Sequence, residues 1–297
     1  MNEPVSPLAH LAKPRALLIV ATVYALLVVI AVSTFPIFDG LHPLWATLIV
    51  DFITTAVIFV LSCLMRNGSL YDAYWSTAPI LLGWGFAVRG TGVPGERVAI
   101  ALIAVSIWGI RLTSNWARGW PGFHHEDWRY VQMRKDTGMS WFMNNLTVVH
   151  VFPTLQVWTG SISLYAALTL GTRDFGLLDV IGAVVIVGGA LISLVADEQL
   201  RAHRRTHTGP CRAGLWKLAR HPNYFGELCA WWGMWIIGVA GHPAAWWWTL
   251  VGPVLMTVLL RTASVPIMDK RSLERRPGYD ELMKELPAIL PIGRKLR

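Results

Sequence analysis

The chain has 297 residues, of which 54% are hydrophobic and only 15% are charged, and its mean hydropathy is +0.46. A soluble domain carries about 25% charged residues, so the composition excludes an ordinary soluble protein and favours one that is solvated by lipid. The net charge of +8 accompanies long apolar runs. It therefore indicates membrane topology and contact with anionic lipid, and no sequence pattern points to nucleic-acid binding.

Eight apolar runs approach the roughly 20 residues that a helix needs to cross a hydrocarbon core. They predict an all-α, polytopic bundle of about seven or eight transmembrane helices, formed by a single domain over residues 1–297 without a cleaved signal peptide. The third, fourth and seventh runs are short enough to tilt or to end partway. In chain order the runs are Ala16–Phe35, Leu44–Met65, Tyr74–Val88, Val98–Leu112, Val148–Leu170, Leu177–Ala196, Phe225–Ala240 and Trp246–Leu260.

The basic residues are distributed unevenly between the connecting segments. If the N-terminus is cytoplasmic, 23 of the 26 Lys and Arg residues lie on the inner side, and the outer side keeps only Arg89, Arg97 and Arg173. This distribution follows the positive-inside rule. It predicts an integral membrane protein with both termini in the cytoplasm, as in a bacterial inner membrane, and with its polar chemistry on that side.

The inner segment after the sixth run has a dense polar pattern. Asp197, Arg201 and Arg204 stand at i, i+4 and i+7, so they share one helical face. A carboxylate can accept hydrogen bonds from ribose hydroxyls while arginines bind phosphate in a bidentate fork. This face therefore suits a nucleotide. A salt-bridged helix end with snorkelling cations is the other interpretation.

The most informative stretch is Arg220–Gly233, which reads RHPNYFGELCAWWG. Pro222 fits the first turn of a new helix, and Asn223 and Glu227 then share a face near the positive end of that helix. Such an end favours phosphate binding. A Glu that points into an apolar span is costly unless it meets a ligand or partner, so Glu227 is predicted to be functional.

This stretch resembles the HPNYxGE and WWG signature of the membrane steroid 5α-reductase superfamily, especially its bacterial DUF1295 branch. The resemblance implies a helical membrane enzyme that binds NADPH in a cytoplasm-facing cavity and reduces an activated carbon–carbon double bond of a lipophilic substrate. It leaves out the first span and extends from about Tyr71 to Pro291. It includes Tyr71-Asp72, Trp75, Arg111-Leu112, Glu126 to Tyr130, Asp197 to Leu200, Ser264-Val265-Pro266, Tyr279 and Pro291.

The resemblance also implies which residues contact the nicotinamide cofactor. Ser193 stands where the steroid enzymes have an Asn. The role of His221 stays open, because a lone His at a helix start is usually a cap or packing residue. The matched positions are Asp197, Arg201, Arg204, Asn223, Tyr224 and Glu227, and further expected contacts are Arg118, Arg129, Arg212, Arg220 and His221.

The implied reaction needs a hydrogen-bond donor for the carbonyl of an enone. The Gln-Glu pair of the steroid enzymes falls on Tyr71 and Asp72, and their catalytic Tyr falls on Trp108, whose indole N–H does not transfer a proton under ordinary conditions. Asp72 can donate if burial keeps it protonated, and Tyr71 can supply a phenol. The loop HHEDWRY offers Glu126 and Tyr130 as alternatives, or is a solvated ion-pair loop.

Other classes of function fit parts of the pattern. An S-adenosylmethionine-dependent methyltransferase of the isoprenylcysteine or phospholipid type shares an RHPxYxG-like string, but it typically adds a Glu-Glu pair where this chain has Asp269-Lys270. A non-catalytic transporter or scaffold is a further alternative, although transporter sites usually lie near the membrane midplane.

Metal and disulfide chemistry are not expected. A di-iron oxygenase needs many converging His ligands, and His203 and His207 give one i, i+4 pair in a basic loop. No obligate protein partner is evident. The three cysteines form no CxxC pair, and neither a zinc site nor a disulfide framework is predicted for Cys63, Cys211 and Cys229.

Overall fold

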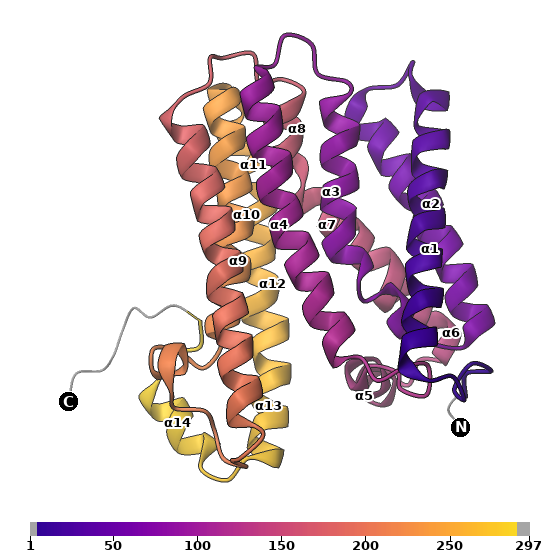
Figure 1. Ribbon diagram of the computed structural model, residues 1–297, viewed down its shortest axis with the longest axis vertical. Helices are drawn as coiled ribbons and strands as arrows, with labels where there is room; N and C mark the ends of the chain where they lie inside the picture. Colours follow the sequence, from indigo (N-terminus) through magenta and orange to yellow (C-terminus); the bar gives the residue numbers. More distant parts are fainter. Residues whose placement is uncertain (1–4, 290–297) are drawn as a thin grey trace.

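The protein is a bundle of long helices that stand side by side, with the short helices α5 and α14 at one end (Figure 1). The computed structural model describes residues 5–289, and within that range helices are the only regular secondary structure. The longest are α1 (Lys13–Thr34), α2 (Pro43–Met65), α4 (Gly95–Gly119), α9 (Leu177–His203) and α10 (Pro222–Gly241). The shorter ones are α3 (Tyr74–Ala87), α5 (Trp128–Thr137), α6 (Trp141–Asn144), α7 (Phe152–Gly160), α8 (Ile162–Leu168), α11 (Trp246–Thr249), α12 (Val251–Leu259), α13 (Val265–Arg275) and α14 (Tyr279–Glu285).

The predicted all-α membrane fold is confirmed. The eight apolar runs are largely helical, and α1 begins at the end of the bundle where α13 and α14 lie, as an even number of crossings requires (Figure 1). That this end faces the cytoplasm stays a prediction, and Pro291, where the resemblance ends, lies outside the described residues. Five stretches are long and apolar enough to cross a membrane, namely Lys13–Phe38, Pro43–Met65, Gly95–Gly119, Leu177–His203 and Pro243–Arg275.

The fifth predicted run is not one regular helix. A π-helical segment, Asn145–Val151, leads into α7, and a turn at Ser161 separates α7 from α8. Within the π-helical segment, the His150 ring lies 2.7 Å from the backbone oxygen of Asn145 through Nδ1. Such wide turns inside helices are frequent at functional sites. Here the irregular turn places Val148 and Val149 in the wall of a cavity at the same end of the bundle as α5.

Helices α9 and α10 make the most extensive helix–helix contact in the described bundle, and glycines allow it. A Cβ atom at Gly189 would lie 2.5 Å from the backbone oxygen of Gly226, and one at Gly233 would lie 2.7 Å from that of Gly182. Small residues at such positions let helix backbones approach closely in a membrane. The contact brings the polar ends of α9 and α10 together.

The glycine contact gives a first prediction, with a neighbouring glycine as its control. Gly189→Ala introduces a methyl group where the α10 backbone already lies, so it should destabilise the folded protein by about 1–3 kcal/mol. Gly188 has nothing within 4 Å of an added Cβ, so Gly188→Ala should be neutral or slightly stabilising. Melting temperatures in detergent measure both effects, and equal values for the two variants would contradict the proposed helix contact.

Candidate functional site

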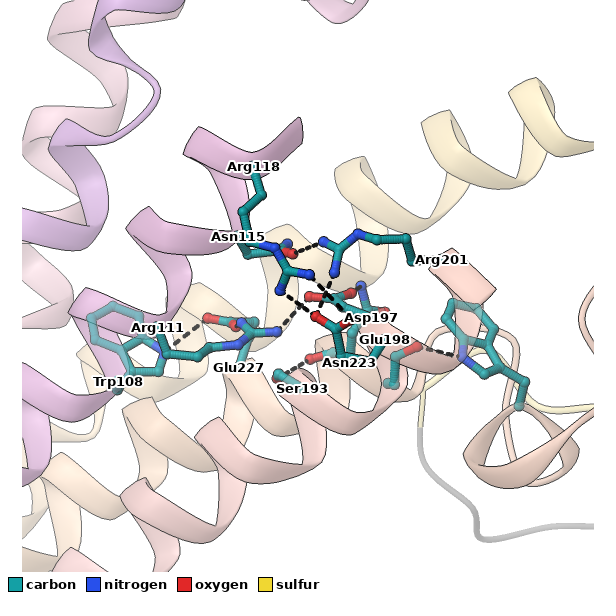
Figure 2. A network of polar contacts seen from close by, with 12 residues as sticks. Trp108, Arg111, Asn115, Arg118, Ser193, Asp197, Glu198, Arg201, Asn223 and Glu227 are labelled. Atoms are coloured by element: carbon teal, nitrogen blue, oxygen red, sulfur yellow. Dashed lines mark hydrogen bonds and ion pairs between the residues drawn. The ribbon is translucent and has the colours of Figure 1, made fainter. Parts of the chain in front are cut away.

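An arginine with a largely buried side chain joins the polar residues at the ends of α9 and α10 (Figure 2). Arg111, on α4, pairs with Asp197 of α9 through Nη2 and with Glu227 of α10 through Nη1, the latter at 2.8 Å. Asn223 Nδ2 donates to the other oxygen of Asp197 at 3.1 Å, and Trp108 Nε1 donates to Glu227 Oε2 at 2.8 Å. The three residues that the sequence predicted to act together, Asp197, Asn223 and Glu227, therefore meet.

The Arg111 cluster, defined as Trp108, Arg111, Asp197, Asn223 and Glu227, is largely withdrawn from solvent. The exposed fraction of the Arg111 side chain is 8%, and the fractions for Asp197 and Glu227 are 13% and 15%. A buried charge that loses its partner is strongly destabilising, so each of the two carboxylates depends on the shared guanidinium. When the Arg111 guanidinium and the Asp197 and Glu227 carboxylates are all ionised, their net charge is negative. The cluster can therefore accept a hydrogen bond from a further donor.

Sequence reasoning missed Arg111 as a site residue. The signal was present in α4, where Trp108, Arg111, Asn115 and Arg118 recur every three or four residues and so share one face of the helix. Ser193 of α9 also connects to the first turn of α10, because its hydroxyl donates to the backbone oxygen of Asn223 at 2.7 Å.

A second, more exposed layer of charges lies beside the Arg111 cluster. Glu198 pairs with both Arg118 and Arg201, and Arg201 Nη2 donates to Asn115 Oδ1 at 2.8 Å (Figure 2). Exposed ion pairs of this kind contribute about 0–1 kcal/mol each to stability. They orient α4 against α9 and keep two predicted cofactor contacts, Arg118 and Arg201, close to the cluster.

Arg204 lies one turn beyond Arg201 and forms no ion pair with an acid in the described part of the chain. The pKa of Arg204 lies below its usual value, because the surrounding chain withdraws water from it and because the guanidiniums of Arg276 and Arg271 repel it. The Asp197 carboxylate acts on the pKa of Arg204 in the opposite direction. Three cations near one another suit an oxyanion such as phosphate. Sequence analysis missed Arg271 and Arg276, which only the fold brings beside α9.

Two buried polar atoms of the Arg111 cluster, Arg111 Nε and Asn223 Oδ1, have no hydrogen-bond partner among residues 5–289. Proteins satisfy the large majority of buried polar groups, so such atoms need an explanation. One of them donates and the other accepts. A ligand that carries hydroxyl or amide groups can satisfy both.

The second group of predicted residues lines a cavity of about 180 Å³ between α5, α7, α10 and the segment that joins α12 to α13. Asp72 is one of its polar lining residues. Tyr130 donates its hydroxyl to Asp72 Oδ1, and Trp116 Nε1 donates to Asp72 Oδ2 at 3.2 Å. Much of the wall is apolar, and its polar lining residues include Tyr71, Asp72, Arg129, Tyr130, Gln156 and Tyr224.

The two aspartates of this region have opposite pKa shifts. Burial, and after it the Asp127 carboxylate, raises the pKa of Asp72 to about 7, although Arg129 and Tyr130 act in the other direction. Burial also opposes the charge of Asp127, but its ion pair with Arg129, at 2.9 Å, outweighs burial and lowers the pKa of Asp127. Asp127 is therefore ionised near neutral pH, whereas Asp72 keeps a proton for part of the time and can donate it.

Glu126 and Tyr71, which were also predicted to take part in chemistry, hold the surrounding structure. Glu126 Oε1 accepts hydrogen bonds from the backbone N–H of Gly68 at 2.9 Å and from Trp141 Nε1 at 3.0 Å. The Tyr71 hydroxyl lies 2.7 Å from Thr154 Oγ1. These hydrogen bonds connect neighbouring segments of the chain. The catalytic roles of Glu126 and Tyr71 stay predictions.

Three other predicted cofactor contacts connect the C-terminal segment to the rest of the protein. Arg220 and His221, at the start of α10, both contact Asp269 of α13 at 2.8 Å. Arg212 pairs with Glu285 at the surface. All three have partners within the chain, and their contribution to cofactor binding stays a prediction.

Within residues 5–289, no group of three or more His, Cys, Asp or Glu side chains could hold a metal ion. The rings of His203 and His207 stack on each other, with their centroids 4.7 Å apart. All three cysteines are free thiols.

Comparison with known proteins places most of the chain in one family. The model of a family described as protein of unknown function (DUF1295) matches residues 58–286. A protein of Schizosaccharomyces pombe that is named as uncharacterized is 24% identical over 278 residues, which cover 84% of this chain and 80% of that protein. No solved structure matches the chain at a significant level. The matched region contains the Arg111 cluster and the Asp72 cavity, whereas α1 and the first part of α2 precede it.

The Arg111 cluster predicts unequal effects of two arginine substitutions on α4. Arg111→Gln leaves two buried carboxylates without their cation and should lower the free energy of unfolding by about 3–5 kcal/mol. Arg118→Gln removes an exposed ion pair with Glu198 and should cost about 0–1 kcal/mol. Unfolding in detergent measures both, and similar small losses would show that Arg111 does not hold the three helices together.

The raised pKa of Asp72 predicts a pH dependence of stability. The folded protein keeps the Asp72 proton up to about pH 7, whereas the unfolded chain loses it near the ordinary value of 3.8. The unfolded state therefore binds fewer protons in this window, and stability from Asp72 is full below about pH 4 and lost as the pH rises to about 7. Asp72→Asn should remove this slope from a series of melting temperatures. Parallel curves for the two proteins would contradict the shift.

Proposed function

The chain belongs to the family of proteins of unknown function DUF1295. From the geometry of its site we propose that it is an NADPH-dependent membrane reductase acting on an activated carbon–carbon double bond of a lipophilic substrate. The observation that carries the proposal is the meeting of Asp197, Asn223 and Glu227 around Arg111. A dinucleotide offers hydroxyls, an amide and phosphates. Those groups match the carboxylates, the unpartnered amide oxygen and the nearby cations.

The residues of the Arg111 cluster fit NADPH group by group. Asn223 Oδ1 can accept a hydrogen bond from an amide or a hydroxyl, and Arg111 Nε can donate one. Arg204, with Arg271 and Arg276 beside it, can bind phosphate oxygens. When bound, NADPH would supply the hydride for the reduction.

Tyr224 connects the two parts of the site. It follows Asn223 in the first turn of α10, and it also lines the Asp72 cavity. A ligand held by Asn223 can therefore extend past Tyr224 towards Asp72. Polar groups on one side of Tyr224 and an acid on the other support the reductase proposal.

Asp72 is the proton donor in this proposal. A pKa of about 7 lets its carboxyl donate a hydrogen bond to a carbonyl oxygen as negative charge develops there, and then transfer the proton. Tyr130 and Trp116 hold the two carboxyl oxygens in place. Trp108, which stands where the steroid enzymes have their catalytic Tyr, instead holds Glu227, so its indole is engaged in the cluster.

The cavity suits one end of a lipophilic acceptor. Its volume of about 180 Å³ is below the roughly 300–1,000 Å³ that encloses a whole drug-sized ligand, so it can hold a reacting group but not a large body. Phe152, which lines it, is 51% exposed on the surface of the bundle. The rest of the substrate can therefore lie against the apolar surface, as a molecule arriving from the bilayer would.

Ligand-dependent melting temperatures of the detergent-purified protein test the cofactor. NADPH at about 100 times its Kd should stabilise the folded state by about 2.7 kcal/mol, because it binds only that state. NADH measured in the same way gives the preference between the two cofactors. Stabilisation by S-adenosylmethionine in the absence of any effect of NADPH would overturn the reductase and favour a methyltransferase.

Two adjacent arginines sharpen this test. Arg204→Gln removes a charge-assisted contact with phosphate and should raise the Kd of NADPH about tenfold or more. Arg205→Gln, an exposed neighbour outside the cation group, is the matched control and should leave the Kd unchanged. Equal affinities in both variants would show that Arg204 does not contact the cofactor.

A further inference from the structure

A larger cavity, of about 810 Å³, lies between α1, α2 and α3, in the half of the bundle away from the Arg111 cluster. The end of α1 and the first half of α2 form two of its sides, and these segments precede residue 58, where the family match begins. The volume is that of a site for a whole small molecule. Its third side is α3, which lies within the family match, and the proposed reductase gives this cavity no role.

Asp51 is the unusual residue in the wall of this cavity. It is only 4% exposed, and the Tyr74 hydroxyl donates to its Oδ1 atom at 2.5 Å. Its Oδ2 atom is also buried and has no hydrogen-bond partner within the described range 5–289. A buried carboxyl oxygen without a partner is costly, and an acid inside an apolar span is functional by default.

Most of the remaining wall is apolar and partly open to the surroundings of the bundle. Val32, Trp84 and Val88 line the cavity, yet they are 66%, 54% and 66% exposed. Around membrane-spanning helices those surroundings are lipid. The cavity can therefore receive an apolar molecule sideways from the bilayer, with its polar end reaching Asp51.

We propose that this cavity binds a lipid alcohol, that is, a long apolar chain or ring system that ends in a hydroxyl group, with the hydroxyl on Asp51 Oδ2. A hydroxyl both donates and accepts, so it pairs with the carboxyl whether Asp51 is ionised or protonated. An amine would need an ionised carboxylate in an apolar wall, which costs desolvation. Arg89, the one cation among the described lining residues, is already paired with Asp39 at 2.7 Å.

The lipid-alcohol site is separate from the Asp72 cavity. Tyr74 lines the former and Tyr71 the latter, and their ring centroids are 4.9 Å apart, so the two tyrosines form part of the wall between them. A ligand can therefore bind in one cavity while the other cavity is empty. The proposal therefore stands independently of the reductase, and its test has its own readout.

Photolabelling of the purified full-length protein tests the site. A hexadecanol with a diazirine on its chain should label peptides of α1, α2 and α3 that line the cavity, and unlabelled hexadecanol should compete where hexadecane does not. Val32→Trp places a bulky ring at the open side and should lower labelling at least about fivefold. Val29→Trp, at a similarly exposed position of α1 outside the lining, is the matched control and should leave labelling unchanged.

The head-group contact is tested at Asp51. Asp51→Leu removes the hydrogen bond and should lower hexadecanol labelling about fivefold, whereas Asp51→Asn keeps a partner for the hydroxyl and should retain most of it. Melting temperatures verify that each variant is folded. Equal labelling by a diazirine hexadecane, preference for the matching hexadecylamine, or insensitivity to Val32→Trp would each overturn the proposal.

Discussion

The organisation of this protein depends on one guanidinium held between two carboxylates among apolar helices. Arg111 joins α4 to Asp197 of α9 and to Glu227 of α10. None of these charges is stable alone in such surroundings, and together they compensate one another. The glycine contact between α9 and α10 makes the arrangement possible, because it brings the two acidic side chains within reach of a single cation. The helix packing and the ion pairs therefore stabilise the same region, where α4, α9 and α10 meet.

Local features of the sequence predicted the fold well, whereas contacts between segments that are distant in the sequence could not be predicted. Apolar length and basic-residue bias are local, and they predicted the helical membrane bundle. The spacing of Asn223 and Glu227 placed both on one face of α10. Arg111 was part of the family resemblance but was not predicted as a site residue, because its partners lie 86 and 116 residues away in the sequence. The π-helical turn at Asn145–Val151 also depends on surrounding contacts. The sequence therefore predicted a regular helix for this apolar run.

Chemical character was harder to predict than position, because it depends on burial. The sequence marked Asp72 and the loop around Asp127 alike as acidic candidates. Folding buries Asp72 beside Tyr130 and Trp116, while Asp127 gains the Arg129 guanidinium, and so their pKa values move in opposite directions. Asp51 is a similar case. Nothing in its neighbourhood of the sequence predicts the cavity that three separate helices form around it.

The central claim is that the Arg111 cluster is the place where a dinucleotide binds, and a structure of the protein saturated with NADPH tests it most directly. Cryo-electron microscopy in a lipid nanodisc should show cofactor density between the ends of α9 and α10, within hydrogen-bond distance of Asn223 Oδ1 and beside Arg204. Density for NADPH elsewhere on the protein, or a saturated sample in which this position holds none, would contradict the account.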